Sequence, residues 1–364
     1  MLPKRTLKKG KAAVAVLLAL LLVTALVIAG CGGSKPAPQQ QAPKPEAKPI
    51  ELKLAHFWPS THQIETVFVP GLAKAIEQAT NGRVKVTSYP GETLLKAAEI
   101  YDGVVKGVAD IGISCYSYTA GRFPVMEAFE LPGTTYNNSK VSDRVAWEGA
   151  KKLNPKELQD TKHLMIISTG PGHLFTKTPV QKLADLKGME IRATGVTAKT
   201  LPLLGATAVA MPQSEAYEAL SRGVVKGNIA PLETLKGFKF AEVVKYVTDT
   251  PFLYNTLFFV TMNKDKFNSL PPDLQKAIED ACAKYYEEKG VGFWDSINDA
   301  GVKLAKEKGV QFLTLSDQEK ALWIERLKPI REDYVKRMKE KGLPGEEVLK
   351  TIQELADKYN KEYK

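Results

Sequence analysis

Cysteine and histidine are scarce in this sequence, which has three cysteines and four histidines among 364 residues. The cysteines stand far apart, at Cys31, Cys115 and Cys282, so no CxxC pair or Cys/His cluster has the spacing of a zinc site. His56 and His62 are close in sequence, but no carboxylate accompanies them at a spacing that favours a metal, and we expect no metal site. We expect Cys115 and Cys282 to be buried free thiols, with a disulfide between them as the alternative.

Fingerprints of nucleotide binding and of hydrolysis are missing from the sequence as well. Neither GxGxxG nor GxxxxGK followed by Ser or Thr occurs, and the GPGH segment at residues 170–173 does not match a phosphate-binding loop. The GxSxG motif that carries a hydrolase nucleophile does not occur either. These absences predict a protein without a cofactor or catalytic residues, and they disfavour the alternative of an exported lyase or hydrolase.

The positive charge of the chain, +10 overall, is concentrated at the N-terminus. Five of the 51 lysines and arginines precede residue 12, whereas all 41 acidic residues follow Cys31, so the chain from Cys31 onward carries +5. No arginine-rich stripe interleaved with aromatic residues is present. We therefore predict no nucleic-acid partner.

The first fifty residues have the pattern of an export signal followed by a spacer. Basic residues lead into an apolar run at 12–30, which ends in Ile-Ala-Gly directly before Cys31. This ending resembles the lipobox of bacterial lipoproteins, and the resemblance implies cleavage before Cys31 and lipidation of its sulfur. A signal anchor is the alternative, since the run is almost long enough to span a bilayer. We predict a signal peptide over 1–30 and, over 31–49, the lipidated cysteine with a Pro- and Gln-rich disordered tether that holds the protein outside the cytoplasm on the cell membrane.

A five-residue string, GVVKG, occurs twice in the remaining chain, at residues 103–107 and 223–227. Each copy follows a helical pattern and precedes an apolar strand pattern, and a proline and an acidic residue precede each helix. Glycine suits a helix end and paired valines suit a strand. We interpret the repetition as two similar α/β lobes, each an open sheet flanked by helices. Ligands of such sheets bind outside the carboxyl ends of the strands, so we expect a binding cleft between the lobes.

The segment 186–231 contains the first candidate binding residue. Its pattern is strand, helix, strand, helix and strand, and Arg192 stands at the end of the first strand. A guanidinium in that position offers a fixed fork of donors to a carboxylate. The alternative is a surface or inter-lobe ion pair.

The hydrophobic pattern predicts α/β structure up to about residue 262 and mainly helices after it. We place lobe 1 at 50–168 plus 263–315, lobe 2 at 169–262, and C-terminal helices that pack on the lobes at 316–364. Among the predicted elements are strands at 51–56, 84–88, 109–114, 163–169, 246–250, 257–263 and 310–315, and helices at 139–153, 273–308 and 344–363. Ser316 and Glu319 predict a capping box at the start of a further helix.

Seven segments together resemble one protein family. They are LKLAH, RVKVTSYPGETL, GVVKGVADIGIS, FPVMEAFELPG, LADLKGMEIRATG, GATAVAMPQSEAYEALSRGVVKGN and LPPDLQKAIEDA. Over residues 51–321 the chain resembles the extracytoplasmic solute-binding proteins of tripartite ATP-independent periplasmic (TRAP) transporters, the DctP-like group. The resemblance implies a two-lobed Venus-flytrap receptor with a long inter-lobe helix. Such a receptor captures an organic anion and delivers it to TRAP permease subunits that use an ion gradient.

The resemblance also implies residue roles. The arginine of the family's KGxxIR motif, which pairs with the ligand carboxylate, corresponds to Arg192. Three positions depart from the family's pattern: Ala230 stands where an asparagine is usual, Gln213 where a phenylalanine is frequent, and Gly172 with His173 replace an arginine of sialic-acid receptors. Sialic acid is therefore not the expected ligand.

With one arginine and many aromatic residues, we expect a monocarboxylate with an apolar or 2-oxo body. A solute-binding protein of an ATP-driven importer is the alternative function. The candidate ligand-binding residues are Arg192, Trp58, Tyr116, Phe175, Gln213, Asn228, Glu233 and Tyr254.

Overall fold

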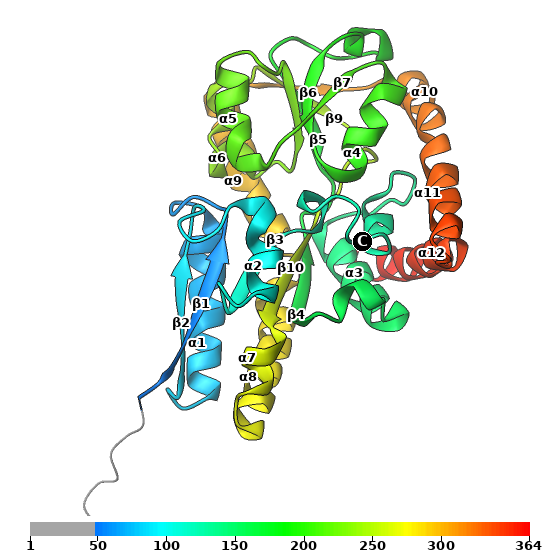
Figure 1. The fold of residues 1–364 in the computed structure, drawn as a ribbon. Coiled ribbons are helices and arrows are strands. Elements are labelled where there is room, and N and C mark those ends of the chain that lie inside the picture. Colours follow the sequence, from blue (N-terminus) through cyan, green and yellow to red (C-terminus); the bar gives the residue numbers. More distant parts are fainter. Residues whose placement is uncertain (1–47) are drawn as a thin grey trace, which may run out of the picture. The chain divides into compact units, whose positions relative to one another are not determined.

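Two β-sheets organise the chain, which we describe from a computed structural model covering residues 48–364 (Figure 1). The predicted signal peptide, Cys31 and most of the tether lie outside the described residues. Within residues 48–364, no helix combines the length and apolar character needed to cross a bilayer. Cys115 and Cys282 are both buried and free, which confirms the expectation of unpaired thiols.

The first sheet has five strands in the order β2-β1-β3-β10-β4. β1, β2 and β3 are parallel, and β10 runs antiparallel to both β3 and β4. Helix α1 (Val69–Ala79) packs on β2, α2 (Ile100–Val105) on β3 and α3 (Ser139–Leu153) on β4. The strands are β1 (Ile50–His56), β2 (Val84–Tyr89), β3 (Ile111–Cys115), β4 (Thr161–Ser168) and β10 (Leu257–Asn263).

The second sheet has six strands in the order β11-β9-β5-β8-β6-β7. The segment around Arg192 supplies β6, β7 and β8 with the intervening helices α4 (Gly195–Thr200) and α5 (Gln213–Ser221), as its pattern predicted. The strands are β5 (His173–Thr176), β6 (Glu190–Ala193), β7 (Thr207–Ala210), β8 (Gly227–Ala230), β9 (Tyr246–Asp249) and β11 (Gln311–Thr314).

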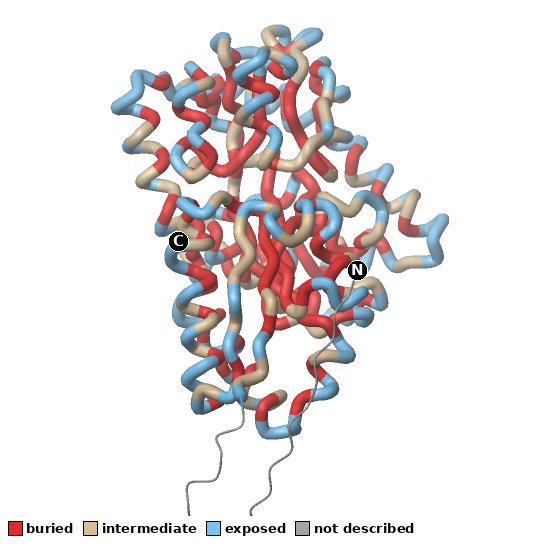
Figure 2. Tube along the Cα trace, turned by 60° about the vertical axis from the view of Figure 1, so that its left-hand side comes forward, coloured by how far each residue is buried: buried red, intermediate tan, exposed pale blue. Residues whose placement is uncertain are grey.

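The two sheets share a topology, which confirms the prediction of two similar α/β lobes. In the first sheet β1 lies between its parallel neighbours β2 and β3, and in the second sheet β6 lies between its parallel neighbours β7 and β8. An antiparallel strand from elsewhere in the chain then pairs with β3 (strand β10) or with β8 (strand β5). The GVVKG strings are not equivalent in structure, however. The first lies across the end of α2 and closes with Gly107 at φ 74°, whereas the second opens with Gly223 at φ 74°, after α5 has ended. Figure 2 shows the buried strands inside both lobes.

The lobe boundaries differ from those expected in two places. The strand β10 (Leu257–Asn263) was expected to belong almost entirely to lobe 2, but it pairs with β3 and β4 of the first sheet. The strand β11 (Gln311–Thr314) was expected in lobe 1, but it pairs in parallel with β9 of the second sheet. Both errors have one cause, because strand pairing is set by neighbours distant in sequence and not by order along the chain.

The predicted helix at 273–308 is wrong as a single helix. Helix α8 (Pro272–Tyr285) ends in a π-turn, Tyr286–Gly290, and α9 (Phe293–Glu307) begins after Gly292, which has φ 76°. α8 packs on α1 of lobe 1, whereas α9 packs on α6 (Thr234–Gly237), which follows β8. The break therefore lies where the chain passes from one lobe to the other.

The buried carboxylate of Asp143, on α3, fixes two of these inter-lobe crossings. Its Oδ1 accepts the Ser168 backbone N–H at 2.6 Å, at the end of β4, and its Oδ2 accepts the Gly292 N–H at 2.8 Å, in the break between α8 and α9. Ser168 in turn donates its hydroxyl to Asn255, on the segment that leads back into β10, at 2.6 Å. Burial raises the pKa of Asp143, and the two backbone hydrogen bonds act in the opposite direction.

The C-terminal helices contact both lobes (Figure 1). Helix α10 packs on the short helices Leu183–Leu186 and Leu201–Leu204 of lobe 2, and α12 packs on α3 of lobe 1. Ser316 caps α10 as predicted, but the Glu319 carboxylate accepts the Leu183 N–H at 2.8 Å and so joins the helix to lobe 2. The remaining helices are α7 (Lys264–Asn268), α10 (Asp317–Leu327), α11 (Pro329–Glu340) and α12 (Gly345–Glu362).

We expect Asp143→Ala to lower the free energy of unfolding by about 2–4 kcal/mol, because two buried backbone N–H groups lose their acceptor. Urea denaturation followed by circular dichroism measures this change. Asp299→Ala is the matched control, since Asp299 on α9 is exposed and makes no side-chain hydrogen bond to a described residue. Equal stability of the two variants would contradict this role of Asp143.

Candidate ligand-binding site

Loops that follow strands of both sheets meet in a cleft. After β1 come Phe57 and Trp58, and after β3 comes the turn Tyr116–Tyr118. From the second sheet, Thr194 follows β6, and the segments after β7 and β8 face the same region. Two cavities lie between these loops, so the cleft is found at the strand carboxyl ends, as expected for open α/β sheets.

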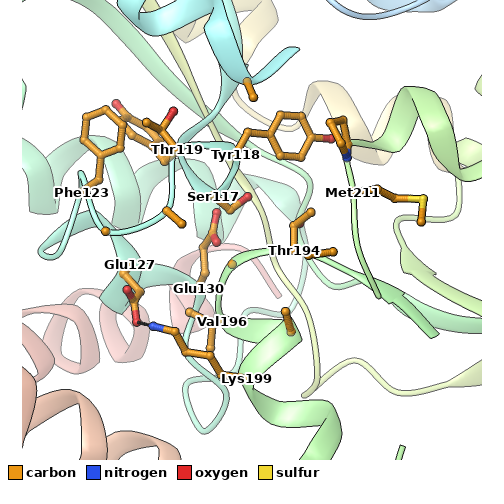
Figure 3. Close-up of a pocket in the computed structure, with 18 residues that line it drawn as sticks. Ser117, Tyr118, Thr119, Phe123, Glu127, Glu130, Thr194, Val196, Lys199 and Met211 are labelled. Carbon is orange, nitrogen blue, oxygen red and sulfur yellow. Dashed lines mark hydrogen bonds and ion pairs between the residues drawn. The ribbon is translucent and has the colours of Figure 1, made fainter. Parts of the chain in front are cut away.

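The larger cavity has a volume of about 470 Å³ and lies between the Tyr116–Tyr118 turn and helix α4 (Figure 3). Lys199, on α4, reaches across to Glu127 of lobe 1 at 2.7 Å, and Arg337 of α11 donates to the same carboxylate oxygen at 2.7 Å. This ion pair connects the lobes at the rim of the cavity. Inside it, the hydroxyls of Tyr116 and Ser117 are buried and have no hydrogen-bond partner among the described residues.

Glu130 is the buried acid of the larger cavity. Its Oε1 accepts the Leu257 N–H at 2.9 Å, and Figure 3 shows its carboxylate close to Ser117. Burial raises the pKa of the Glu130 carboxyl to about 8, despite the opposing effect of the hydrogen bond from Leu257. This pKa favours the protonated form of Glu130 at pH 7.

The smaller cavity, of about 20 Å³, is enclosed mainly by aromatic rings. Trp58 stacks on Phe57 with 4.0 Å between ring centroids and meets Phe258 edge-on at 5.0 Å. The volume is close to that of one water molecule, so the rings or the lobes must move apart before an organic ligand enters. The lining residues are Phe57, Trp58, Cys115, Tyr118, Thr169, Gln213, Pro231, Glu233, Thr234, Phe238, Tyr254 and Phe258.

Tyr118 lines both cavities and bridges the lobes. Its hydroxyl accepts the backbone N–H of Gln213, at the start of α5, at 2.9 Å. Both atoms of the Gln213 side-chain amide are buried without a hydrogen-bond partner among the described residues. Unpaired buried amides are rare in folded proteins, so these atoms are candidates for contact with a ligand.

Arg192 lies fully within the protein, with 1 % of its surface exposed. Its Nε donates to the Met211 carbonyl at 2.9 Å, and its Nη1 donates to Asn228 Oδ1 at 3.4 Å. The two side chains are neighbours because Arg192 on β6 pairs in register with Asn228 on β8. Within residues 48–364, no carboxylate lies within 4 Å of the guanidinium. A buried cation without a counter-ion is unfavourable unless a ligand supplies the negative charge.

The Arg192 charge acts on groups that line the smaller cavity. Burial raises the pKa of Cys115, Tyr118 and Tyr254, and in each case the Arg192 charge lowers it in part. The Nδ2 of Asn228 is buried without a partner among the described residues. A cation and several unpaired amide atoms therefore lie beside an aromatic cavity.

The eight candidate residues are not all in one place. Trp58, Gln213, Glu233 and Tyr254 line the smaller cavity, and Tyr116 lines the larger one. Arg192 and Asn228 contact each other and line neither cavity, although the Arg192 charge acts on Cys115, Tyr118 and Tyr254 of the smaller one. Phe175, on β5, is fully buried in the hydrophobic core and lines neither cavity. A side chain on a strand points to one face or the other, and the sequence did not show which face of β5 meets the core.

The histidines considered for a metal each pair with a glutamate instead. His56 Nε2 lies 2.8 Å from Glu65 Oε2, and His62 Nε2 lies 2.8 Å from Glu233 Oε2. Glu65 lies nine residues from His56 in sequence, whereas Glu233 lies 171 residues from His62. In the part of the chain that the structure describes, no three His, Cys, Asp or Glu side chains form a group suited to a metal ion.

Several cavity residues were absent from the sequence-based set, among them Tyr118, Glu130, Lys199, Met211 and Phe238. Met211 directly follows β7, and Tyr118 lies three residues after β3 in the same turn as the candidate Tyr116, so their positions after strands indicate both. Glu130 and Phe238 lie outside such positions and reach the cleft through the packing of distant segments. No pattern in the sequence distinguishes them.

Comparison with known proteins identifies the family. Residues 54–337 match the model of DctP, bacterial extracellular solute-binding protein, family 7. The chain belongs to this family. The family is one of receptors and not of enzymes.

Characterised relatives agree with this assignment. The 2,3-diketo-L-gulonate-binding periplasmic protein YiaO of Escherichia coli K12 is 27 % identical over 77 % of this chain and 84 % of its own length. A solved TRAP solute-binding protein from a marine metagenome, described as specific for aromatic acid ligands, is 32 % identical, with a TM-score of 0.81 over 85 % of this chain and 99 % of its own. A TRAP solute-binding protein from Rhodoferax ferrireducens T118, solved with copurified benzoate, is 28 % identical, with a TM-score of 0.81 over 86 % and 99 %. These DctP relatives support a two-lobed receptor fold over nearly the whole described chain.

The raised pKa of Glu130 predicts a pH effect on the stability of this DctP-family protein. Its folded-state pKa of about 8 lies above the ordinary value of 4.5, so its contribution favours folding below about pH 4.5 and is lost as pH rises through 8. We expect Glu130→Gln to gain stability relative to the wild type as pH rises from 5 to 8, by at most about 1.4 kcal/mol per pH unit.

Urea denaturation at several pH values measures this difference. Glu99→Gln is the control, because Glu99 is exposed and its carboxylate makes no hydrogen bond to a described residue. A stability difference between Glu130→Gln and the wild type that stays constant from pH 5 to 8 would contradict the buried, protonated state of Glu130.

Proposed function

We propose that this protein captures an aromatic monocarboxylate outside the cytoplasm and delivers it to a TRAP-type permease. The observation that carries the proposal is the fully buried Arg192, whose guanidinium has no carboxylate partner among the described residues. A ligand carboxylate would supply that partner through two charge-assisted hydrogen bonds. The Gln213 amide and the Asn228 Nδ2, which have no hydrogen-bond partner among the described residues, would add polar contacts.

The aromatic lining supports a ligand with a flat apolar body. Four of the residues enclosing the smaller cavity, Phe57, Trp58, Phe238 and Phe258, have rings without a charge. Offset-stacked and edge-on contacts with such rings favour an aromatic ligand. The relatives that bind aromatic acids or benzoate, at about 30 % identity and equal TM-scores, point to the same chemical class.

Closure of the lobes explains how binding leads to delivery. Tyr118 with Gln213, His62 with Glu233 and Lys199 with Glu127 are contacts between the lobes in the closed form. A ligand that contacts Arg192 of lobe 2 and the Trp58 ring of lobe 1 makes both sets of contacts only when the lobes are closed, and only such differential affinity shifts the conformational equilibrium. The closed shape is then the state that a permease recognises.

Location and partners follow from the family and from the N-terminal pattern. A lipid on Cys31 would hold the receptor at the membrane, and residues 32–49 would let the folded part reach the permease. The protein then acts as a binding receptor without catalysis, and the permease partner is of the TRAP type and not an ATP-driven importer.

Arg192→Lys should weaken binding of benzoate by a few kcal/mol, about a hundredfold in Kd, because an ammonium cannot replace the planar guanidinium fork. Isothermal titration calorimetry on the domain from residue 48 measures this loss. Native mass spectrometry of the same domain, purified without refolding and then denatured, identifies any acid that copurifies. Unchanged affinity in Arg192→Lys would remove Arg192 from the site.

Cys31→Ser should abolish lipid attachment and release the protein from the membrane fraction, because a hydroxyl does not replace the thiol in thioether formation. The measurement is fractionation of cells, with intact mass analysis of the mature protein. Cys115→Ser is the control, since this thiol is buried in the folded domain. Membrane attachment that survives Cys31→Ser would favour an uncleaved signal anchor.

A further inference from the structure

Glu233 places a second charge in the cleft, opposite in sign to Arg192. It follows β8 and immediately precedes α6, and its side chain is 4 % exposed while lining the smaller cavity. Its backbone N–H donates to Asn298 Oδ1, on α9, at 3.0 Å. This hydrogen bond fixes the backbone of Glu233, from which its carboxylate extends toward the cavity.

His62, from the loop after β1, orients this carboxylate. Its Nδ1 accepts the Ile64 N–H at 3.0 Å, so the ring proton lies on Nε2, which donates to Glu233 Oε2 at 2.8 Å. Gly237 leaves room for the pair, because a Cβ at that position would lie 2.5 Å from the His62 ring and 2.6 Å from Glu233 Oε2. The backbone N–H of Ile64, the contact between His62 of lobe 1 and Glu233 of lobe 2, and the space at Gly237 together fix the geometry of the His62–Glu233 pair.

The other oxygen of Glu233, Oε1, accepts no hydrogen bond from a described residue. A carboxylate offers about four acceptor sites, and one hydrogen bond from a neutral imidazole leaves most of them open. In a cavity enclosed by Trp58 and Phe238, an unsatisfied carboxylate is unfavourable once water is displaced. A ligand that fills the cavity must therefore bring a donor to this oxygen.

We propose that Glu233, positioned by His62, selects aromatic carboxylates that carry a hydroxyl group on the ring. The hydroxyl donates to Glu233 Oε1 while the ligand carboxylate pairs with Arg192. This inference rests on the proposed function and names the substrate class within it. Sites built to hydrogen-bond a ligand hydroxyl strongly reject the analogue that lacks it, because their own polar group is left unpaired.

The same geometry disfavours two other kinds of ligand. An unsubstituted aromatic acid displaces water from Glu233 but has no hydrogen-bond donor for its Oε1. A dicarboxylate brings a second negative charge toward Glu233, and like charges at close range in a buried site repel each other. The hydroxyl group meets neither difficulty.

The first test needs only the wild-type domain. Calorimetric titration with benzoate, the three hydroxybenzoate isomers and benzene-1,3-dicarboxylate compares the ligand classes directly. At least one hydroxybenzoate should bind about ten- to a hundredfold more tightly than benzoate, the range of a hydrogen bond to a charged group. The dicarboxylate should bind more weakly than benzoate.

Glu233→Gln assigns the preference to this side chain. The amide still accepts from His62 but carries no charge, so the preference for the hydroxybenzoate should fall about tenfold, and benzoate and the dicarboxylate should bind more tightly than to the wild type. Loss of folding does not produce a gain in binding. Glu65→Gln is the matched control, since Glu65 pairs with His56 at the same 2.8 Å and lines neither cavity.

The outcomes separate this inference from the proposed function. If benzoate and all hydroxybenzoates bind equally, or if Glu233→Gln keeps the full preference, the hydroxyl selectivity is overturned while the aromatic carboxylate function stands. If 4-(aminomethyl)benzoate binds more tightly than every hydroxybenzoate, the group facing Glu233 is a cation and the inference also fails. If no aromatic acid binds to the wild type, both proposals fail together.

Discussion

The two lobes depend on one buried carboxylate where the chain passes between them. Asp143 accepts backbone N–H groups from Ser168, at the end of β4, and from Gly292, in the break of the long helix. Ser168 also binds Asn255 on the returning segment, so these crossings share one hydrogen-bond cluster. Short buried hydrogen bonds fix the crossing points, while the segments beyond them belong to different sheets. The crossings are therefore joined at one point, whereas each lobe keeps its own sheet.

The cleft between the lobes combines buried charged side chains with aromatic rings. Arg192 is buried without an acid partner among the described residues, and Glu233 is buried with His62 as its hydrogen-bond partner. The two charges belong to the same lobe, and the loop after β1 contributes His62 and Trp58 from the other. Neither charge is satisfied by the protein alone. In the function that we propose, the ligand supplies the missing partners, so the free energy of the closed form depends on the ligand and the closed form signals occupancy to a membrane partner.

Much of the fold followed from local pattern. The strand at 257–263 and the helix at 139–153 agree with the structure to the residue, because a short, mostly apolar run marks a fully buried strand and helical spacing marks the buried face of a helix. The repeated string predicted two similar lobes correctly, although the two copies occupy different positions relative to their helices. The prediction of a single helix at 273–308 was wrong: the helix breaks at residues 290–292, where the Gly292 N–H donates to Asp143, a residue distant in sequence. The rule that ligands bind outside the carboxyl ends of the strands predicted the position of the cleft, and it also applies to Tyr118 and Met211.

The sequence by itself determined the α/β class, the two-lobed plan, the scarcity of metal and nucleotide signals and the position of Arg192 at a strand end. The tertiary structure decided which side chains share the cleft. His62 and Glu233 are 171 residues apart and meet only because the lobes close, whereas Phe175 turns into the core because of the register of β5. The physical reason is the same in both cases. Burial and pairing across distant segments depend on strand register and lobe contact, which no local pattern of residues encodes.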